Sequence, residues 1–186
     1  MRVDRDGAHS TNLASGNIWA PVCSPDGEFV FYESVEQPQK IWKVPVEGGA
    51  PVKVDDVLAD QVDDVAISPD GKFLAYMYAQ YGHVPSHGWS VAVIPTSGGR
   101  PVRNLKVSED IGCLHWSPDG KGLQYRLTKG GADNVWEQPL DGGQPRQLTK
   151  FTSGQIFDFN WSADHTQLLL ARGSISSDAV LISDLQ

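Results

Sequence analysis

The stretch HWSPDGKGLQYRL, residues 115–127, places strand-like residues on both sides of the tetrapeptide Ser117-Pro118-Asp119-Gly120. Proline presets the backbone for the first central position of a type I turn, aspartate tolerates the second, and glycine accepts the positive φ that often follows. The stretch therefore predicts a tight hairpin between two β-strands.

The same tetrapeptide recurs along the chain. It returns at residues 24–27 and 68–71, and in the degraded form Ser-Ala-Asp-His at 162–165, at intervals of about 45 residues. An active site is not usually copied four times, whereas a period of this length indicates a repeat architecture. Asp26, Asp70 and Asp119 are therefore predicted to form turns rather than to catalyse a reaction.

Each repeat contains four strand-like segments. Two apolar segments flank the turn, a third follows, and a shorter, more polar one comes after a double glycine such as Gly142-Gly143. The first two are apolar on both faces, which fits sheets packed between neighbouring sheets. The sequence predicts an all-β fold, a β-propeller of four-stranded antiparallel blades with four blades per chain, alone or as half of an eight-bladed ring.

The repeats give boundaries within a single propeller array over residues 1–186. We expect blade 1 at residues 16–58, blade 2 at 59–107, blade 3 at 108–152, and blade 4 at 153–186 without its outer strand. Residues 1–15 align with the tail of a repeat and are predicted to close the last blade, with residues 8–14 pairing with 179–185. Closure within one chain, closure through a homodimer and a fragment of a larger ring all remain open.

The recurring pattern W-S-P-D-G-K-x-L-x-Y, followed by I-W-x-x-P-x-x-G-G-x-P-x-x-L-T, is best preserved from His115 to Thr149. It resembles the WD-repeat-like β-propellers of the bacterial TolB type, and the resemblance covers essentially the whole chain. The last repeat, from Gly154, further resembles the carboxyl-terminal propellers of bacterial membrane serine/threonine kinases or transcriptional regulators. The chain contains no kinase motif, so the resemblance implies an interaction or signalling module without kinase activity.

Charge and composition argue against several partners. The chain has 15 Lys and Arg against 23 Asp and Glu, a net charge of −8, and its basic residues are scattered singly. This pattern speaks against nucleic acid and anionic membranes as partners. No apolar run is long enough to span a membrane, and the first ten residues lack the core of a signal peptide. We expect a soluble chain. The sequence leaves its cellular compartment open, and the compartment would be the periplasm if a larger parent protein is exported there.

Catalytic and metal-binding patterns are absent from the sequence. No G-x-S-x-G motif occurs, so we expect no enzyme, no cofactor and no metal site. Cys23 and Cys113 lack metal-type spacing and are predicted to be buried free thiols. The segment 81–88 carries His83 and His87, but in a loop their spacing does not place them on one face. With Tyr81 and Trp89 they are predicted to form an interaction loop instead.

The innermost strands offer a candidate ligand site. Asp64, His115, Asp158 and Asn160 occupy positions that alternate with apolar residues just before the turns. A period of two would place them on one face near the propeller axis, where they could bind water, a cation or a small polar ligand. Such groups also commonly satisfy hydrogen bonds of neighbouring strands.

Three functions fit these observations. The first is a non-catalytic module for a protein partner, which uses the loops at the blade edges. The second is a sensor that binds a small ligand or a cation in the central channel. The third, suggested by family analogy alone, is a propeller that gates substrate access to a peptidase.

Overall fold

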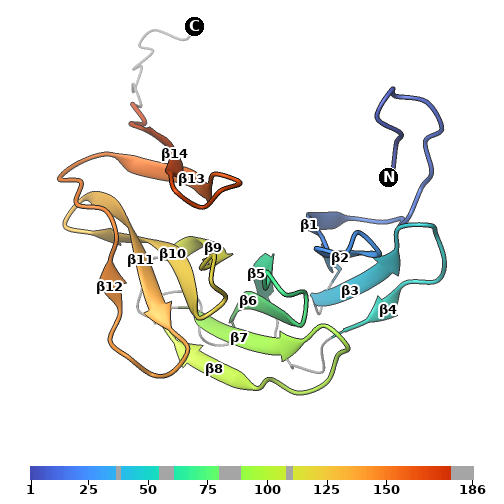
Figure 1. Cartoon of the computed structure of the whole chain (residues 1–186), viewed down its shortest axis with the longest axis horizontal. Coiled ribbons are helices and arrows are strands. Elements are labelled where there is room, and N and C mark those ends of the chain that lie inside the picture. The colour runs from blue at the N-terminus through green and yellow to red at the C-terminus, as the bar shows by residue number, and fades with distance from the viewer. Residues whose placement is uncertain (37–38, 55–60, 80–88, 108–110, 177–186) are drawn as a thin grey trace, which may run out of the picture.

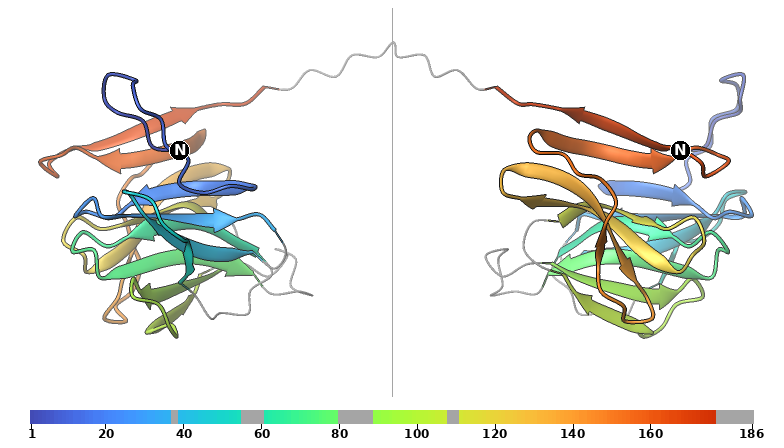
Figure 2. Two further views of the ribbon diagram at one scale, coloured as in Figure 1. Left: turned by 90° about the vertical axis from the view of Figure 1, so that its right-hand side faces the viewer. Right: turned by 60° about the vertical axis from the view of Figure 1, so that its left-hand side comes forward.

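The computed structural model describes residues 1–36, 39–54, 61–79, 89–107 and 111–176. Within these ranges the regular secondary structure consists of β-strands alone. Figure 1 shows the strands grouped into small sheets that stand side by side along an open arc. Figure 2 shows the same sheets stacked from the side. The prediction of an all-β propeller built from antiparallel blades is confirmed.

The four sheets follow one another along the chain. Three have four strands in sequential order, and the fourth has two described strands. The strands are β1 (Ile18–Cys23), β2 (Phe29–Ser34), β3 (Lys40–Pro45) and β4 (Val52–Lys53) in blade 1; β5 (Gln61–Ile67), β6 (Phe73–Ala79), β7 (Ser90–Pro95) and β8 (Arg103–Lys106) in blade 2; β9 (Ile111–Trp116), β10 (Gly122–Lys129), β11 (Ala132–Pro139) and β12 (Arg146–Gln147) in blade 3; and β13 (Gln155–Trp161) and β14 (Leu168–Gly173) in blade 4.

Hydrophobic clusters fill the spaces between adjacent blades. Ile41 and Leu74 belong to the cluster between blades 1 and 2, whereas Ala75 and Leu123 belong to the cluster between blades 2 and 3. Val135 and Ile156 join blades 3 and 4. Both faces of the inner strands are therefore apolar because each face of an interior blade packs on another blade.

The recurring tetrapeptide forms the predicted turn between the first two strands of each blade. In blade 3 the Ser117 hydroxyl donates to Asp119 Oδ1 at 2.7 Å and accepts the Gly122 N–H at 2.8 Å. The same Asp119 oxygen accepts the Lys121 N–H at 3.0 Å. Gly120 has a φ of 70°, which glycine adopts without steric cost. Asp119 is thus a turn former, as predicted.

Replacement of Asp119 by alanine should lower the free energy of unfolding by about 1 kcal/mol, because the turn loses two acceptor contacts. The Ser117 hydroxyl and the Lys121 N–H also lower the pKa of Asp119, so the carboxylate's contribution should fade as the pH falls through the acidic range. Chemical denaturation of Asp119→Ala beside Asp119→Asn, which keeps an acceptor, measures the effect. An unchanged midpoint for Asp119→Ala would contradict this role.

The amino-terminal residues 1–15 lie beside blade 1. Their one bridge within the described chain joins Arg2 to Thr11, and Arg2 donates to the Val46 carbonyl at 3.1 Å and pairs with Glu47 at 2.7 Å. Figure 1 places this arm and blade 4 at opposite ends of the arc. The predicted partner strand, residues 179–185, lies outside the described residues, so closure of the last blade by the arm stays a prediction.

Candidate functional site

A β-bulge interrupts the innermost strand of the first three blades at the same position, four residues before the turn serine. Ala20, Asp64 and Cys113 occupy it with φ values of 46°, 51° and 55°. In blade 2 the register moves from Asp63 opposite Met77 to Ala66 opposite Ala75, so two residues oppose one. A bulge of this kind bends the strand and re-aims its side chains.

The alternation of side chains continues between the bulge and the turn. Strict alternation predicted that His115 lies on the face opposite to Leu114 and Trp116. The contacts have this arrangement, because Leu114 and Trp116 pack in the cluster between blades 2 and 3, whereas the His115 ring packs on Phe159 of blade 4. Residues from both faces of this strand nevertheless line one cavity, so its wall combines polar and apolar side chains.

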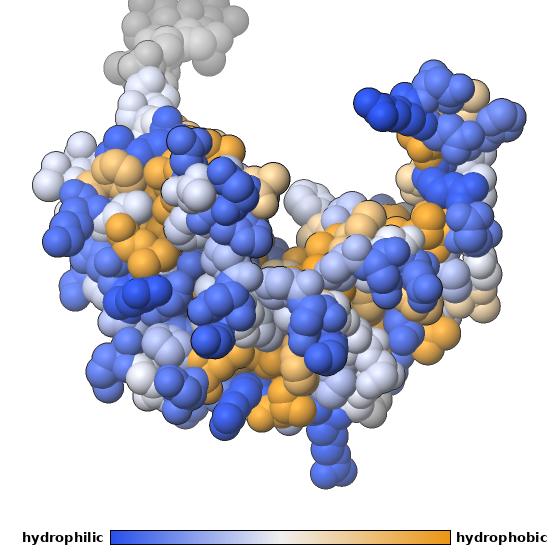
Figure 3. Space-filling view, in the orientation of Figure 1, coloured by the Kyte–Doolittle hydropathy of each residue, from blue (hydrophilic) through white to orange (hydrophobic). Residues whose placement is uncertain are grey.

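The cavity lies on the concave side of the arc, where the innermost strands of all four blades converge. Its volume is about 720 Å³. Figure 3 shows this side as a hollow between the two ends of the arc. The lining residues are Ala20, Pro21 and Val22 from blade 1; Asp64, Val65, Ala66, Ile67 and Pro69 from blade 2; Cys113, Leu114, His115, Trp116 and Pro118 from blade 3; and Phe157, Asp158, Asn160, Trp161, Ser162, Ala163 and His165 from blade 4.

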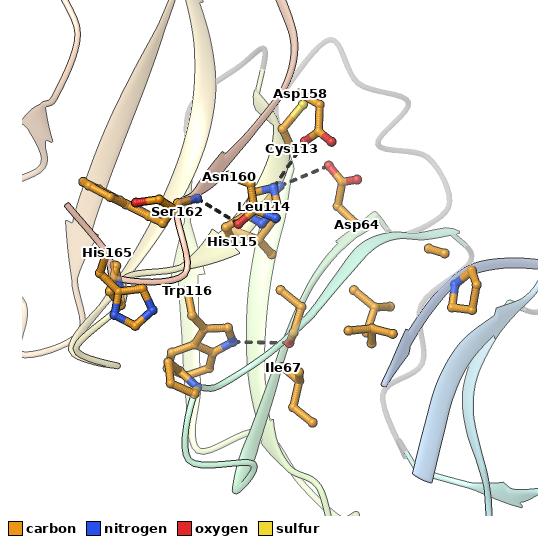
Figure 4. Close-up of a pocket in the computed structure, with 18 of the residues that line it drawn as sticks. Asp64, Ile67, Cys113, Leu114, His115, Trp116, Asp158, Asn160, Ser162 and His165 are labelled. Atoms are coloured by element: carbon orange, nitrogen blue, oxygen red, sulfur yellow. Dashed lines mark hydrogen bonds and ion pairs between the residues drawn. The ribbon is translucent and has the colours of Figure 1, made fainter. Parts of the chain in front are cut away.

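Three of the four predicted channel residues form contacts between blades. His115 Nε2 lies 3.4 Å from Asp158 Oδ1, which joins blades 3 and 4. Asp64 Oδ2 accepts the Leu114 N–H at 3.4 Å and joins blades 2 and 3. Figure 4 shows Asp64 and Asp158 beside the strand that carries Leu114 and His115. The predicted set is therefore brought together on one wall.

Asn160 lines the same wall but makes a local contact. Its Oδ1 accepts the Trp161 N–H at 2.8 Å, and Figure 4 shows it above His115. The His115 ring packs on Phe159 with ring centroids 4.7 Å apart. These contacts hold the polar side chains of the wall in defined positions.

The channel wall is acidic and rich in acceptors. Among the described residues that line it are two carboxylates, those of Asp64 and Asp158, and no lysine or arginine. The Asp158 carboxylate is largely exposed, which leaves it open to a ligand. A wall of this chemistry favours cationic groups and hydrogen-bond donors. Among the residues that the structure describes, no group of three metal-ligating side chains is close enough to hold a metal ion.

The two cysteines have different environments. The Cys113 thiol donates to the Phe157 carbonyl at 3.3 Å, and burial, together with the Asp64 carboxylate, raises its pKa to about 11. Cys113 is therefore a protonated thiol at neutral pH rather than a nucleophile. The prediction that both thiols are buried is wrong: Cys113 is half-buried, and Cys23 is exposed because no described blade packs on its side of blade 1.

Glu33 lies behind the channel wall, between blades 1 and 2, and the sequence reasoning missed it. Only 5% of it is exposed, and its Oε1 has no hydrogen-bond partner. Burial first, and then the carboxylates of Asp63 and Asp64, raise its pKa to about 8. A signal existed in the sequence, since this acid stands in the apolar strand FVFYES, where the next repeat has Met77.

The predicted interaction loop is largely outside the described residues. This applies to Tyr81, His83 and His87, whose role stays a prediction. Trp89 is half-buried and packs against the cluster between blades 2 and 3, and its carbonyl accepts the Val107 N–H at 3.3 Å. No helix in the described parts of the chain is long and apolar enough to cross a membrane.

A scan against protein-family models finds no match for this chain. Among curated proteins, an uncharacterized protein of Agrobacterium fabrum is 29% identical over 133 residues, which cover 70% of this chain and 42% of that protein. Dipeptidyl-peptidase 5 of Porphyromonas gingivalis is 29% identical over 84 residues, which cover 45% of this chain and 12% of the peptidase.

Solved structures match the arc of blades. A protein solved as TolB of Agrobacterium tumefaciens superimposes with a TM-score of 0.68 at 26% identity, over 83% of this chain and 53% of that one. TolB of Acinetobacter baumannii gives a TM-score of 0.71 at 20% identity, over 95% of this chain and 43% of that one. The fold is that of a TolB-type β-propeller. The chain thus spans about half of each TolB-type propeller protein and less than half of each curated relative.

Part of a solved peptidase matches the same fold. A puromycin-hydrolysing peptidase of Mycobacterium tuberculosis superimposes with a TM-score of 0.64 at 22% identity, over 82% of this chain and 26% of that one. The TolB-like part of the predicted resemblance is confirmed by the structural matches. Resemblance to WD-repeat proteins and to kinase-linked propellers stays a prediction.

Proposed function

We propose that this chain is a non-catalytic propeller module that binds a segment of a protein partner at its channel wall. The observation that carries the proposal is the cavity of about 720 Å³, which the innermost strands of all four blades build together. Asp64, His115 and Asp158 point donors and acceptors at one surface of this cavity, and the blade interfaces behind them are packed. Ligand sites typically combine a concave, partly apolar wall with a few fixed polar groups.

The chemistry of the wall supports binding rather than catalysis. Each turn serine donates to the aspartate of its own turn, as Ser117 does to Asp119, and Cys113 is held as a thiol. In the described part of the chain, no serine or cysteine side chain is hydrogen-bonded to a histidine side chain. The resemblance of the repeats supports a place in a larger bacterial signalling protein, with the periplasm as its compartment.

A sensor that binds a small cation or amine is the second candidate. It is favoured by the two carboxylates of a wall whose described residues include no lysine or arginine. A propeller that gates a peptidase is the third, and the matches to Dipeptidyl-peptidase 5 and to the puromycin-hydrolysing peptidase favour it. These two candidates differ from the first in the ligand. The sensor would bind a small ligand in the cavity, and the gating propeller would let a peptide substrate pass.

A triple alanine variant of Asp64, His115 and Asp158 tests the proposal. The variant should lose at least tenfold in affinity for the partner that co-purifies with the wild-type chain, because the wall loses its fixed polar groups. A control that replaces Asp4, His9 and Asp141 removes the same residue types from exposed positions outside the cavity and should bind normally. Calorimetry with the isolated partner measures both affinities.

The outcomes separate the candidates. Partner binding that survives in the triple variant would contradict the proposal. If binding of a small amine or cation is lost at the same time, the sensor is selected. If the triple variant retains both partner binding and the binding of the small amine or cation, the channel wall is not the binding surface.

A further inference from the structure

The turn of blade 4 carries a histidine where the other three turns carry a glycine. Three residues after the turn serine, the backbone has φ values of 74°, 72° and 70° in blades 1, 2 and 3 and of 57° in blade 4. In chain order these residues are Gly27, Gly71, Gly120 and His165. This left-handed conformation suits glycine and costs free energy in a residue that has a Cβ atom. Such positions cluster at ligand-binding and active sites.

The turn itself does not need the histidine ring. The Ser162 hydroxyl donates to Asp164 Oδ1 at 2.6 Å, and the His165 N–H donates to the Ser162 carbonyl at 2.8 Å. In blade 3, where Gly120 holds this position, the equivalent distances are 2.7 and 2.9 Å. The same hydrogen bonds thus form with either residue, so the side chain of His165 adds nothing to the turn.

The direction of this side chain follows from the other turns. A Cβ atom at Gly71 would lie 3.4 Å from Pro25 of the preceding blade, and one at Gly120 would lie 3.7 Å from Pro69. A side chain at this position therefore points back toward the turn of the preceding blade, which for His165 is the turn of blade 3. His165 accordingly lines the cavity of the candidate site.

The cavity has two ends of different chemistry. Residues of the turns line part of it, among them Ala163, which stands where the first three turns have a proline. Figure 4 shows His165 and Trp116 in this part, apart from the carboxylates of Asp64 and Asp158. We call these two parts the turn end and the carboxylate end.

The His165 ring supplies hydrogen-bonding atoms to a region whose other polar groups are already used. The Trp116 indole N–H donates to a backbone carbonyl of blade 2 at 3.2 Å, and that of Trp161 donates to Gln124 at 2.8 Å. The Ser162 hydroxyl is held by its own turn. Neither ring nitrogen of His165 has a hydrogen-bond partner among the residues that the structure describes. A neutral imidazole ring offers one donor and one acceptor.

We propose that His165 is a specificity-determining residue of the channel, whose ring donates a hydrogen bond to a carbonyl oxygen of a bound peptide segment. The inference deepens the proposed function and rests on it. The carboxylates of Asp64 and Asp158 attract a basic side chain, whereas His165 binds a hydrogen-bond acceptor, and a peptide backbone carries such an acceptor in every residue. Because the two ends differ, the segment binds in one direction, with a lysine or arginine at the carboxylate end.

Peptides selected on the wild-type chain serve as the probe. A displayed library of random peptides is enriched on this chain, and peptides that also bind the triple alanine variant of Asp64, His115 and Asp158 are removed. The remaining peptides bind the cavity, and we expect them to share a lysine or an arginine. A library that yields no such peptides would contradict the proposed function and the inference together, whereas cavity-binding peptides without a basic residue would contradict the inference alone.

Replacement of His165 by glycine separates the inference from the proposed function. His165→Gly restores the residue of the other turns, so its urea midpoint should equal or exceed that of the wild type. Its affinity for the selected peptides should nevertheless fall about fivefold to tenfold, because a hydrogen bond is lost. His9→Gly is the matched control, since His9 also has a positive φ, of 48°, but lies outside the cavity, and it should bind the peptides normally. Unchanged affinity in His165→Gly would overturn the inference and leave the proposed function standing.

Amide variants show whether the ring acts as a donor. The side-chain amides of asparagine and glutamine place an N–H close to the positions of Nδ1 and Nε2 of a histidine. At least one of His165→Asn and His165→Gln should therefore bind the peptides more tightly than His165→Gly. In nitrogen NMR spectra, a ring signal that is absent from His165→Gly should shift when the peptide binds the wild type. Two amide variants as weak as His165→Gly, or a ring signal that stays in place, would contradict the hydrogen bond from His165.

Discussion

Replacement of Glu33 by glutamine should raise the free energy of unfolding at pH 8 on the order of 2–4 kcal/mol. Glu33 is buried between blades 1 and 2 and faces two aspartates, and its pKa is raised from 4.5 to about 8. Between these two values the folded protein holds a proton that the unfolded chain releases. The wild-type stability must therefore fall as the pH rises from about 4.5 to about 8, and glutamine removes this loss.

Urea denaturation at pH 4.5, 6 and 8 measures the effect. The difference between Glu33→Gln and the wild type should be small at pH 4.5, where Glu33 is largely protonated, and should grow toward pH 8. Glu28→Gln, at an exposed carboxylate of the blade 1 turn, is the matched control and should change stability by less than about 0.5 kcal/mol. A difference that is the same at every pH would contradict the buried proton.

Replacement of Gln124 by alanine should lower the free energy of unfolding by about 2–4 kcal/mol. The Gln124 side chain is buried and accepts the Trp161 indole N–H at 2.8 Å across the interface between blades 3 and 4. It also donates to Glu137 Oε2 at 2.7 Å, while Glu137 Oε1 accepts two hydrogen bonds from Arg146. Alanine would leave a cavity and deprive a buried carboxylate of one donor.

Thermal and urea denaturation of Gln124→Ala test this network. Gln144→Ala, which removes an exposed glutamine from the loop before β12, should leave the stability unchanged. Trp161 fluorescence should shift to longer wavelength in Gln124→Ala because water gains access to the indole. A Gln124→Ala protein as stable as the control would show that the network contributes little to the packing of blades 3 and 4.

Much of the fold could be predicted from the repeats. The tetrapeptide at Ser117 and the double glycine at Gly142 recur at matched spacings, and each repeat contributes a local signal for the same hairpin. Local turn chemistry and long-range packing agree here, so a prediction made for one repeat is tested by the next. The structure accordingly has its inner strands and turns where the sequence places them.

The candidate site was predicted in part. Asp64 and Asp158 stand four residues before their turn serines and His115 stands two before, and these spacings were enough to place them on one wall, since equivalent positions of a repeat lie at equivalent depths. The bulge at Asp64 and Cys113 was missed, because no glycine marks the left-handed position that these residues occupy. Glu33 was missed because its environment depends on a neighbouring blade and not on its own strand.

Site-specific photocrosslinking tests the central claim most directly. A photoreactive amino acid at Ala163, which lines the cavity, should form an adduct with the partner in cells that make the protein. The same amino acid at Val102, exposed near the outer strand of blade 2, should form none. The adduct should disappear when Asp64, His115 and Asp158 are replaced by alanine. Adducts at Val102 without adducts at Ala163 would contradict the claim that the channel wall is the binding surface.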